Sequence, residues 1–151
     1  MIGASAGGLV PLRALLGSLP TNYPAAVFVV VHLAPETPSV LADILDAASR
    51  LPVVRGRSGA RIRRGTVTVA PADCHLMLTH DTVLLSRGPR ENRHRPSIDV
   101  LFRSAAVVFG PRVTGVVLSG LLDDGSAGLW GIKRRGGITV VQYPDDANSP
   151  T

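Results

Sequence analysis

Near its start the chain carries a glycine-rich stretch, Gly3-Ala4-Ser5-Ala6-Gly7-Gly8, in which a single serine stands between glycines. The stretch lies where a strand is expected to pass into a helix. A serine in a sharp strand-to-helix turn exposes its hydroxyl, and the same turn offers backbone N–H groups to an oxyanion. A turn of this composition also cradles phosphate groups or simply tightens a loop. By itself the stretch leaves a nucleophilic serine, an anion cradle and a plain turn open.

The pattern that follows alternates helices with buried strands. Leucines at helical spacing predict a helix over residues 9–19, and a valine-rich apolar run predicts a strand buried on both faces over residues 25–31. Further helices are expected over residues 38–49, 97–109 and 126–135, and further strands over residues 113–118 and 138–142. Such alternation is typical of parallel strands joined by helices. We therefore predict an α/β fold: a mainly parallel, doubly wound sheet with helices on both faces.

The middle of the chain departs from this alternation. Residues 53–87 contain short apolar segments separated by Gly, Pro, Asp and Arg, which is typical of β-hairpins. We expect a small antiparallel excursion at about residues 53–90. Because the chain has 151 residues, no internal repeat and no low-complexity linker, residues 1–151 are expected to form a single domain.

Composition narrows the class of protein. Apolar residues make up 45% of the chain, which fits a packed globular core, and no apolar run approaches the ~20 residues of a membrane span. Cys74 is the only cysteine, which excludes an internal disulfide and fits a reducing compartment. Since the sequence shows no basic-then-apolar leader, we expect a cytoplasmic domain without direct membrane insertion.

The net charge of +5 comes almost wholly from arginine, since Lys133 is the only lysine. The arginines form two clusters, at positions 55, 57, 61, 63 and 64 and at positions 87, 90, 93 and 95. These clusters are either a basic surface that attracts acidic partners or ordinary solvated surface charges. Neither cluster contains Phe, Tyr or Trp to stack on bases, so we expect no nucleic-acid partner.

Three polar side chains follow the ends of expected strands. Ser5 ends the first, His32 ends the second, and the pair Asp123-Asp124 follows the strand over residues 113–118. Ligands of open parallel sheets bind outside the carboxyl ends of the strands, so neighbouring strands would bring these groups into one crevice. A serine nucleophile needs a histidine to accept its proton, and the histidine needs a carboxylate to hold its tautomer. The sequence therefore points to a Ser-His-Asp triad.

Structural roles for the same residues stay open at this point. His32 could bind backbone groups, and Asp123 and Asp124 could form a turn and cap the next helix. Asp99 is an alternative acid, although its place in the first turn of a helix favours a capping role. Cys74, His75 and His80 lack a recognised metal spacing. We expect neither a metal nor a cofactor.

The order of five motifs resembles the catalytic domain of the chemotaxis receptor protein-glutamate methylesterases of CheB type. The motifs are Gly3-Ala4-Ser5-Ala6-Gly7-Gly8, Val31-His32-Leu33, the Ala-Pro…His segment at residues 70–76, the Arg-Pro-Ser-Ile-Asp helix start at residues 95–102, and Ser119-Gly120-Leu121-Leu122-Asp123-Asp124-Gly125. The family has Thr where this chain has Ala6, and Gly where it has Leu122. Its first strand and its carboxyl terminus also extend further. The resemblance covers the catalytic part alone, without the receiver domain of two-domain members.

The resemblance implies a nucleophile at Ser5, a base at His32 and an acid at Asp124 rather than Asp123. It places oxyanion and substrate contacts at Ala6, Leu121 and Arg95. It implies hydrolysis of glutamate γ-methyl esters, with deamidation of glutamines as a related reaction. The expected partners are the cytoplasmic domains of methylated chemoreceptors. Without a receiver domain, regulation is expected to be absent, supplied by a separate chain, or lost with missing residues.

Two other functions remain as alternatives. The changes at Ala6 and Leu122 and the shorter termini also fit a relative that binds a receptor or an anionic ligand without turnover. A nucleotide-binding domain that uses the turn at residues 3–8 is the third candidate, although His32 stands where an acidic ribose ligand would be expected.

Overall fold

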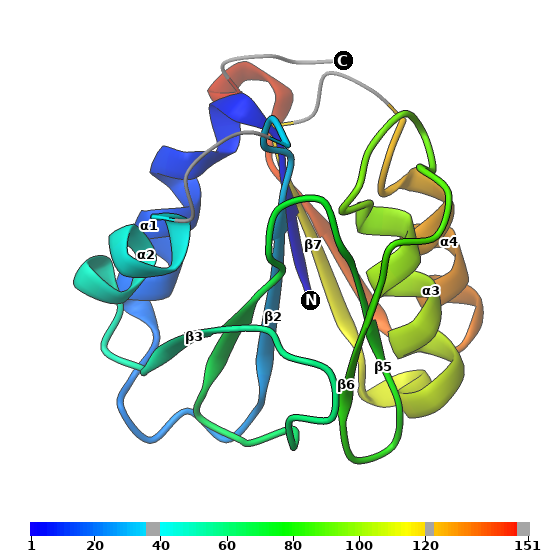
Figure 1. The fold of residues 1–151 in the computed structure, drawn as a ribbon. Coiled ribbons are helices and arrows are strands. Elements are labelled where there is room, and N and C mark those ends of the chain that lie inside the picture. Colours follow the sequence, from blue (N-terminus) through cyan, green and yellow to red (C-terminus); the bar gives the residue numbers. More distant parts are fainter. Residues whose placement is uncertain (36–39, 120–122, 148–151) are drawn as a thin grey trace.

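A computed structural model describes residues 1–35, 40–119 and 123–147 of the chain. Six parallel strands form the main sheet in the order β3-β4-β2-β1-β7-β8 (Figure 1). Their bounds are Ile2–Ala4 (β1), Val27–Val31 (β2), Val53–Arg55 (β3), Val67–Val69 (β4), Thr114–Leu118 (β7) and Ile138–Val141 (β8). From β1 the chain enters β2, passes to the edge strand β3 and returns to β4 between them, and it later enters β7 and β8 on the other side of β1. The strand order therefore reverses at β1. Ligand sites of doubly wound sheets lie at this position.

Helices cover both faces of the sheet, which confirms the predicted fold class (Figure 1). Two helices, α1 (Leu9–Ser18) and α2 (Leu41–Ala48), pack on one face, and α3 (Ile98–Phe109) and α4 (Ser126–Arg134) pack on the other. The central strand β2 shows why its sequence is apolar throughout. Val27, Val29 and Val31 enter the core beneath α1 and α2, whereas Phe28 and Val30 enter the core beneath α3. A strand covered on both faces has no position for a polar side chain.

The antiparallel excursion is smaller than the predicted one at residues 53–90. In the described ranges, the strands that pair antiparallel are β5 (His75–Leu78) and β6 (Val83–Ser86), and they form a separate hairpin that packs against α3. The segments expected to be hairpin strands at β3 and β4 are instead parallel strands of the main sheet. Strands of three residues carry no sequence signal for direction, because both pairings bury the same valines. The predicted start of the second helix at Pro38 lies outside the described residues.

Gly8 shows how tightly the turn after β1 is built. A short 3-10 turn at Ala6–Gly8 connects β1 to α1, and the Gly8 N–H donates to the Ser5 carbonyl at 2.8 Å. A Cβ atom on Gly8 would lie 2.6 Å from the Ala4 Cβ atom and 2.8 Å from the Leu118 carbonyl oxygen. The turn can therefore lie against both β1 and β7 only because this position lacks a side chain.

We expect Gly8→Ala to lower the free energy of unfolding by about 1–3 kcal/mol, because the added methyl group meets backbone that cannot move aside freely. Gly131→Ala is the matched control, since a Cβ atom at Gly131 in α4 meets nothing within 4 Å. Replacing a glycine inside a helix by alanine should stabilise by about 0.5–1 kcal/mol. Urea unfolding of both variants measures the difference. Equal effects of the two substitutions would contradict the packing role of Gly8.

Candidate active site at the carboxyl edge of the sheet

The strand register brings Ser5 and His32 to the same edge of the sheet. Ala4 at the end of β1 pairs with Val31 at the end of β2, and the His32 N–H donates to the Ala4 carbonyl at 3.0 Å. On the other side, the Ser5 N–H donates to the carbonyl of Ser119, which follows β7, at 3.1 Å. Ser5 therefore lies between the ends of two strands that come from distant parts of the sequence, as the strand-end pattern predicts.

The Ser5 hydroxyl is buried and donates to the Ser119 carbonyl. Among the described residues this carbonyl, and not the His32 ring, is the partner of Ser5 Oγ. Ser119 itself has a φ of 43°, in the left-handed region, which turns the chain away from β7 directly beside the serine. In this state the serine proton is held by a backbone acceptor.

His32 and Asp124 form a short hydrogen bond, 2.6 Å between Nε2 and Oδ2. An ionised carboxylate can only accept, so His32 Nε2 carries the proton and Nδ1 is left with its lone pair. His32 is half-buried, and the side chain of Asp124 is wholly buried. The pair has the geometry of a histidine whose tautomer is fixed by an aspartate.

Asp124 also accepts hydrogen bonds from the first residues of α3. Its Oδ1 atom accepts from the Ser97 hydroxyl at 2.8 Å and the Asp99 N–H at 3.0 Å, and its Oδ2 atom accepts from the Ile98 N–H at 2.7 Å. Burial alone would raise the pKa of the Asp124 carboxyl. The hydrogen bonds from the His32 ring and from the start of α3 outweigh burial, so this pKa lies well below its usual range. Asp124 is therefore an anion at neutral pH.

Asp99 serves the neighbouring helix in the same way. Its Oδ1 atom accepts the Gly125 N–H at 3.0 Å and the Gly128 N–H at 2.6 Å, at the start of α4. Asp124 thus caps α3, the helix that carries Asp99, and Asp99 caps α4, the helix that follows Asp124. Ser97 is the Ncap residue, as expected, but its hydroxyl donates to Asp124 instead of capping its own helix. The two helices hold each other's first turns through these two buried carboxylates.

Arg95 is engaged by the loop that precedes it. Its guanidinium donates to Asp73 Oδ1 from Nε at 2.9 Å and from Nη2 at 2.7 Å, and it also donates to the carbonyls of Arg87 and Gly88. The hydrogen bond from Arg95 lowers the pKa of Asp73. These contacts tie residues 73, 87, 88 and 95 together. The structure therefore gives Arg95 a structural role within this loop, and the substrate contact expected from the resemblance stays a prediction.

The remaining expected residues fall into two groups. The structure describes the backbone of Ala6, whereas Leu121 and Leu122 lie outside the described residues. His75 is held within the fold, since its Nε2 donates to the Pro89 carbonyl at 2.8 Å and its Nδ1 accepts the Ser97 N–H at 3.2 Å. In the part of the chain that the structure describes, no cluster of His, Cys, Asp or Glu has the arrangement of a metal site.

Two residues beside the His32–Asp124 pair were missed from the sequence. Asn92 donates from Nδ2 to Asp124 Oδ1 at 3.0 Å and to Asp99 Oδ2 at 2.7 Å. The His94 ring stacks on the His32 ring, with ring centroids 3.6 Å apart and an angle of 3° between the planes. Both lie in the second arginine cluster, where the charge pattern drew attention to the arginines.

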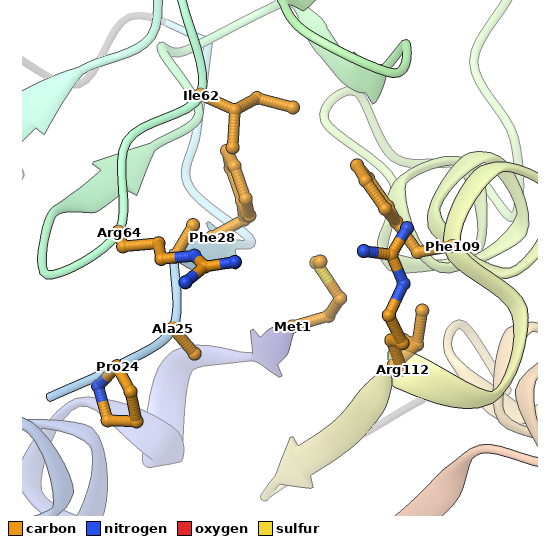
Figure 2. A pocket seen from close by; sticks show the side chains of 10 residues that line it. Met1, Pro24, Ala25, Phe28, Ile62, Arg64, Phe109 and Arg112 are labelled. Carbon is orange, nitrogen blue, oxygen red and sulfur yellow. The ribbon is translucent and has the colours of Figure 1, made fainter.

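A hollow of about 350 Å³ opens away from these residues, beside the amino ends of the strands (Figure 2). Its walls are largely apolar, and Figure 2 shows Met1 between Phe28 and Phe109, with the side chains of Arg64 and Arg112 reaching into the same space. The candidate site has no residue in this hollow. No helix in the described ranges is long and apolar enough to cross a membrane.

Fold and site together define a parallel α/β domain with a serine, a histidine and a buried aspartate at the carboxyl edge of its sheet. A family model described as CheB methylesterase matches residues 1–151, and the chain belongs to this family. This confirms the resemblance seen in the sequence.

Relatives and a solved structure agree with this assignment. The chain is 43% identical over 149 residues to a protein-glutamate methylesterase/protein-glutamine glutaminase 2 of Methanosarcina mazei, covering 93% of this chain and 41% of that protein. A protein-glutamate methylesterase/protein-glutamine glutaminase of Photorhabdus laumondii is 39% identical, with 93% and 41% covered. The chain therefore spans about two fifths of the length of these relatives. The catalytic domain of the Thermotoga maritima CheB methylesterase superposes with a TM-score of 0.94 at 31% identity, over 99% of this chain and 81% of that one.

Asp124 should make stability depend on acid pH. Its pKa is lower in the folded state than in the unfolded state, where it is about 3.9, so protons favour unfolding between the two values. The stabilisation is complete above about pH 4 and is lost as the pH falls toward the folded-state pKa. We expect Asp124→Asn to lower the free energy of unfolding by about 2–4 kcal/mol at pH 7, and by less at pH 3.

Urea unfolding followed by circular dichroism at both pH values measures this difference. Asp123→Asn is the matched control, because Asp123 is exposed one position earlier in the chain. A loss at Asp124 that is the same at pH 3 as at pH 7, or that Asp123→Asn reproduces, would contradict the role of the ionised carboxylate.

Proposed function

We propose that this chain is a serine hydrolase that removes methyl groups from glutamate γ-methyl esters of chemoreceptors, with Ser5 as nucleophile, His32 as base and Asp124 as the acid that orients it. The observation that carries the proposal is the 2.6 Å bond between His32 and the buried Asp124, at the strand end next to Ser5. A histidine fixed in this way needs only a nearby hydroxyl to complete the machinery of acyl transfer.

The reaction begins with the transfer of the Ser5 proton. The hydroxyl leaves the Ser119 carbonyl, and His32 Nδ1, the nitrogen that Asp124 does not use, accepts its proton as Oγ attacks the ester carbonyl carbon. The tetrahedral intermediate collapses when the C–O bond to the methoxy group breaks, and His32 returns the proton to give methanol. Water, deprotonated by the same nitrogen, then cleaves the acyl-enzyme to glutamate and free Ser5.

Asp124 stabilises the imidazolium that forms in each step. Because its pKa is held low, it remains an anion while His32 is protonated, and the proton stays on the histidine. We assign the oxyanion contacts to the backbone N–H groups of Ala6 and Leu121. Ala6 begins the turn directly after Ser5, where N–H groups at a helix start lack intrahelical partners.

The arginine-rich surface supports an acidic macromolecular substrate. Arg55, Arg57, Arg61 and Arg63 border a hollow of about 450 Å³ beside the edge strand β3, together with Thr66 and Thr68. None of the residues that line this hollow is acidic. Positive charge concentrated at one place on the surface raises the rate of encounter with an acidic partner. The relatives named above also carry a glutaminase activity in their names, so we propose deamidation of receptor glutamines as a second reaction of the same site.

Ser5→Ala should abolish methanol release from a methylated receptor cytoplasmic fragment, with a loss of about 10⁴-fold or more in kcat. Ser18→Ala is the control, since Ser18 is an exposed serine at the end of α1. Release of methanol should be followed for the native chain and both variants at equal, saturating substrate. Methanol release that persists in Ser5→Ala would refute the assignment of the nucleophile.

The same experiment separates the esterase from the alternative without turnover. Binding of the receptor fragment is measured in parallel by calorimetry. If the native chain binds the fragment but releases no methanol, the crevice is a binding site and the hydrolase proposal fails.

A further inference from the structure

A tight turn brings two side chains to the His32–Asp124 pair. Glu91 and His94 face each other across this turn, with the Glu91 N–H donating to the His94 carbonyl at 3.1 Å and the His94 N–H donating to the Glu91 carbonyl at 2.8 Å. The two central residues, Asn92 and Arg93, have φ angles of 51° and 69°. Positive φ at both central positions defines a type I′ turn, in which the second position normally holds glycine. Arg93 therefore adopts a costly backbone conformation, and such conformations collect at functional sites.

The turn is anchored to the rest of the fold. The Glu91 carboxylate accepts hydrogen bonds from Arg103 Nη2 on α3, at 2.9 and 2.8 Å. From this anchored turn, Asn92 donates to Asp124 and His94 stacks on His32. One turn thus contacts both partners of the 2.6 Å hydrogen bond.

The contact between the two histidine rings is a face-to-face contact. A centroid separation of 3.6 Å at an angle of 3° is van der Waals contact over the whole ring, so the plane of His32 cannot tilt toward His94. The hydrogen bond to Asp124 fixes one ring atom of His32, Nε2, but it allows rotation of the ring about that contact. The stack removes this freedom and so determines where Nδ1 points.

His94 makes this contact as a neutral ring. Its Nε2 atom is buried and has no hydrogen-bond partner among the residues that the structure describes. Burial lowers the pKa of His94, and the nearby His32 and Arg90 lower it further against the opposing effect of Asp124. A neutral ring can lie face to face with His32, whereas a second charged ring at this distance would repel a positive charge on its neighbour.

We propose that His94 is a positioning residue that acts through the face of its ring, holding the His32 plane so that Nε2 meets Asp124 and Nδ1 is directed at Ser5. The nitrogen atoms of His94 neither accept nor donate a proton during the reaction. The expected effect of His94 on kcat rests on the proposed esterase function, whereas its expected effect on the orientation of the His32 ring does not.

Two substitutions separate the ring face from the ring nitrogens. His94→Phe keeps an aromatic face and removes both nitrogens, whereas His94→Ala removes the stack. We expect His94→Ala to lower kcat for methyl ester hydrolysis by about 10²-fold with KM little changed, the scale of loss expected from a misplaced catalytic group. We expect His94→Phe to recover most of that activity. His80→Phe and His80→Ala are the matched controls, because His80 is exposed between β5 and β6.

The orientation of the His32 ring gives a readout that needs no turnover. Asp124 keeps His32 in the Nε2–H form in all three chains, whereas the nuclear Overhauser contacts of the His32 ring protons in NMR spectra at pH 7 report the plane of the ring. We expect the native chain and His94→Phe to give the contacts of one fixed His32 ring, and His94→Ala to give the averaged contacts of a ring that rotates about its hydrogen bond to Asp124.

The outcomes are distinct. If His94→Phe loses as much activity as His94→Ala, or if His94→Ala keeps both its activity and the single orientation of the His32 ring, the positioning role is refuted. If the native chain hydrolyses no methyl ester, the proposed function fails. The NMR comparison of the three chains then decides the positioning role alone.

Discussion

The site and the second layer of helices both depend on one buried anion, the Asp124 carboxylate. A carboxylate removed from water is strongly destabilising unless donors surround it. Here the donors are Asn92, three groups from residues 97–99 at the start of α3, and the His32 ring. Two of these donors, the Ile98 and Asp99 N–H groups, themselves need an acceptor, because the first N–H groups of α3 have no partner within the helix. The requirement of the helix and that of the anion are therefore met together, and His32 is oriented as a consequence.

The reciprocal arrangement of Asp124 and Asp99 explains how the strand ends and the helix starts are held in register. Asp99 in the first turn of α3 binds N–H groups at the start of α4, and Asp124 before α4 binds N–H groups at the start of α3. The two helices cannot slide past each other without breaking a bond to a buried charge. Since α4 follows the segment that leaves β7, this constraint also fixes where Asp124 lies relative to the end of β1. The packing of α3 against α4 therefore determines the position of the Asp124 carboxylate relative to Ser5.

Much of this could be predicted from the sequence, and the rest could not for identifiable reasons. The apolar β2 and the helical spacing of leucines before Pro20 predict a doubly wound sheet, and the strand-end rule together with the five motifs places Ser5, His32 and Asp124 at one edge. The parallel direction of β3 and β4 escaped prediction, because strands of three residues, Val-Val-Arg and Val-Thr-Val, fit either direction. Asp99 was expected to cap a helix, but the helix that it caps is its neighbour, and no local pattern reports a partner in another element. His94 was missed because its turn lacks the glycine that normally marks a type I′ turn, so positive φ at Arg93 had no signal.

Ser5, His32 and Asp124 differ in how many hydrogen bonds hold each of them at this edge of the sheet. Ser5 contributes a hydroxyl that binds the Ser119 carbonyl, and if the hydroxyl is removed this carbonyl still accepts the Ser5 N–H. Asp124 contributes a charge on which five donors depend, so that its loss disturbs a helix start as well as a histidine. In the proposed reaction, the nucleophile is thus the group whose hydrogen bond is most easily exchanged, and the orienting group is the one held most firmly. The proposed transfer of a proton from Ser5 to His32 requires this division, because the donor has to turn while the acceptor keeps its place.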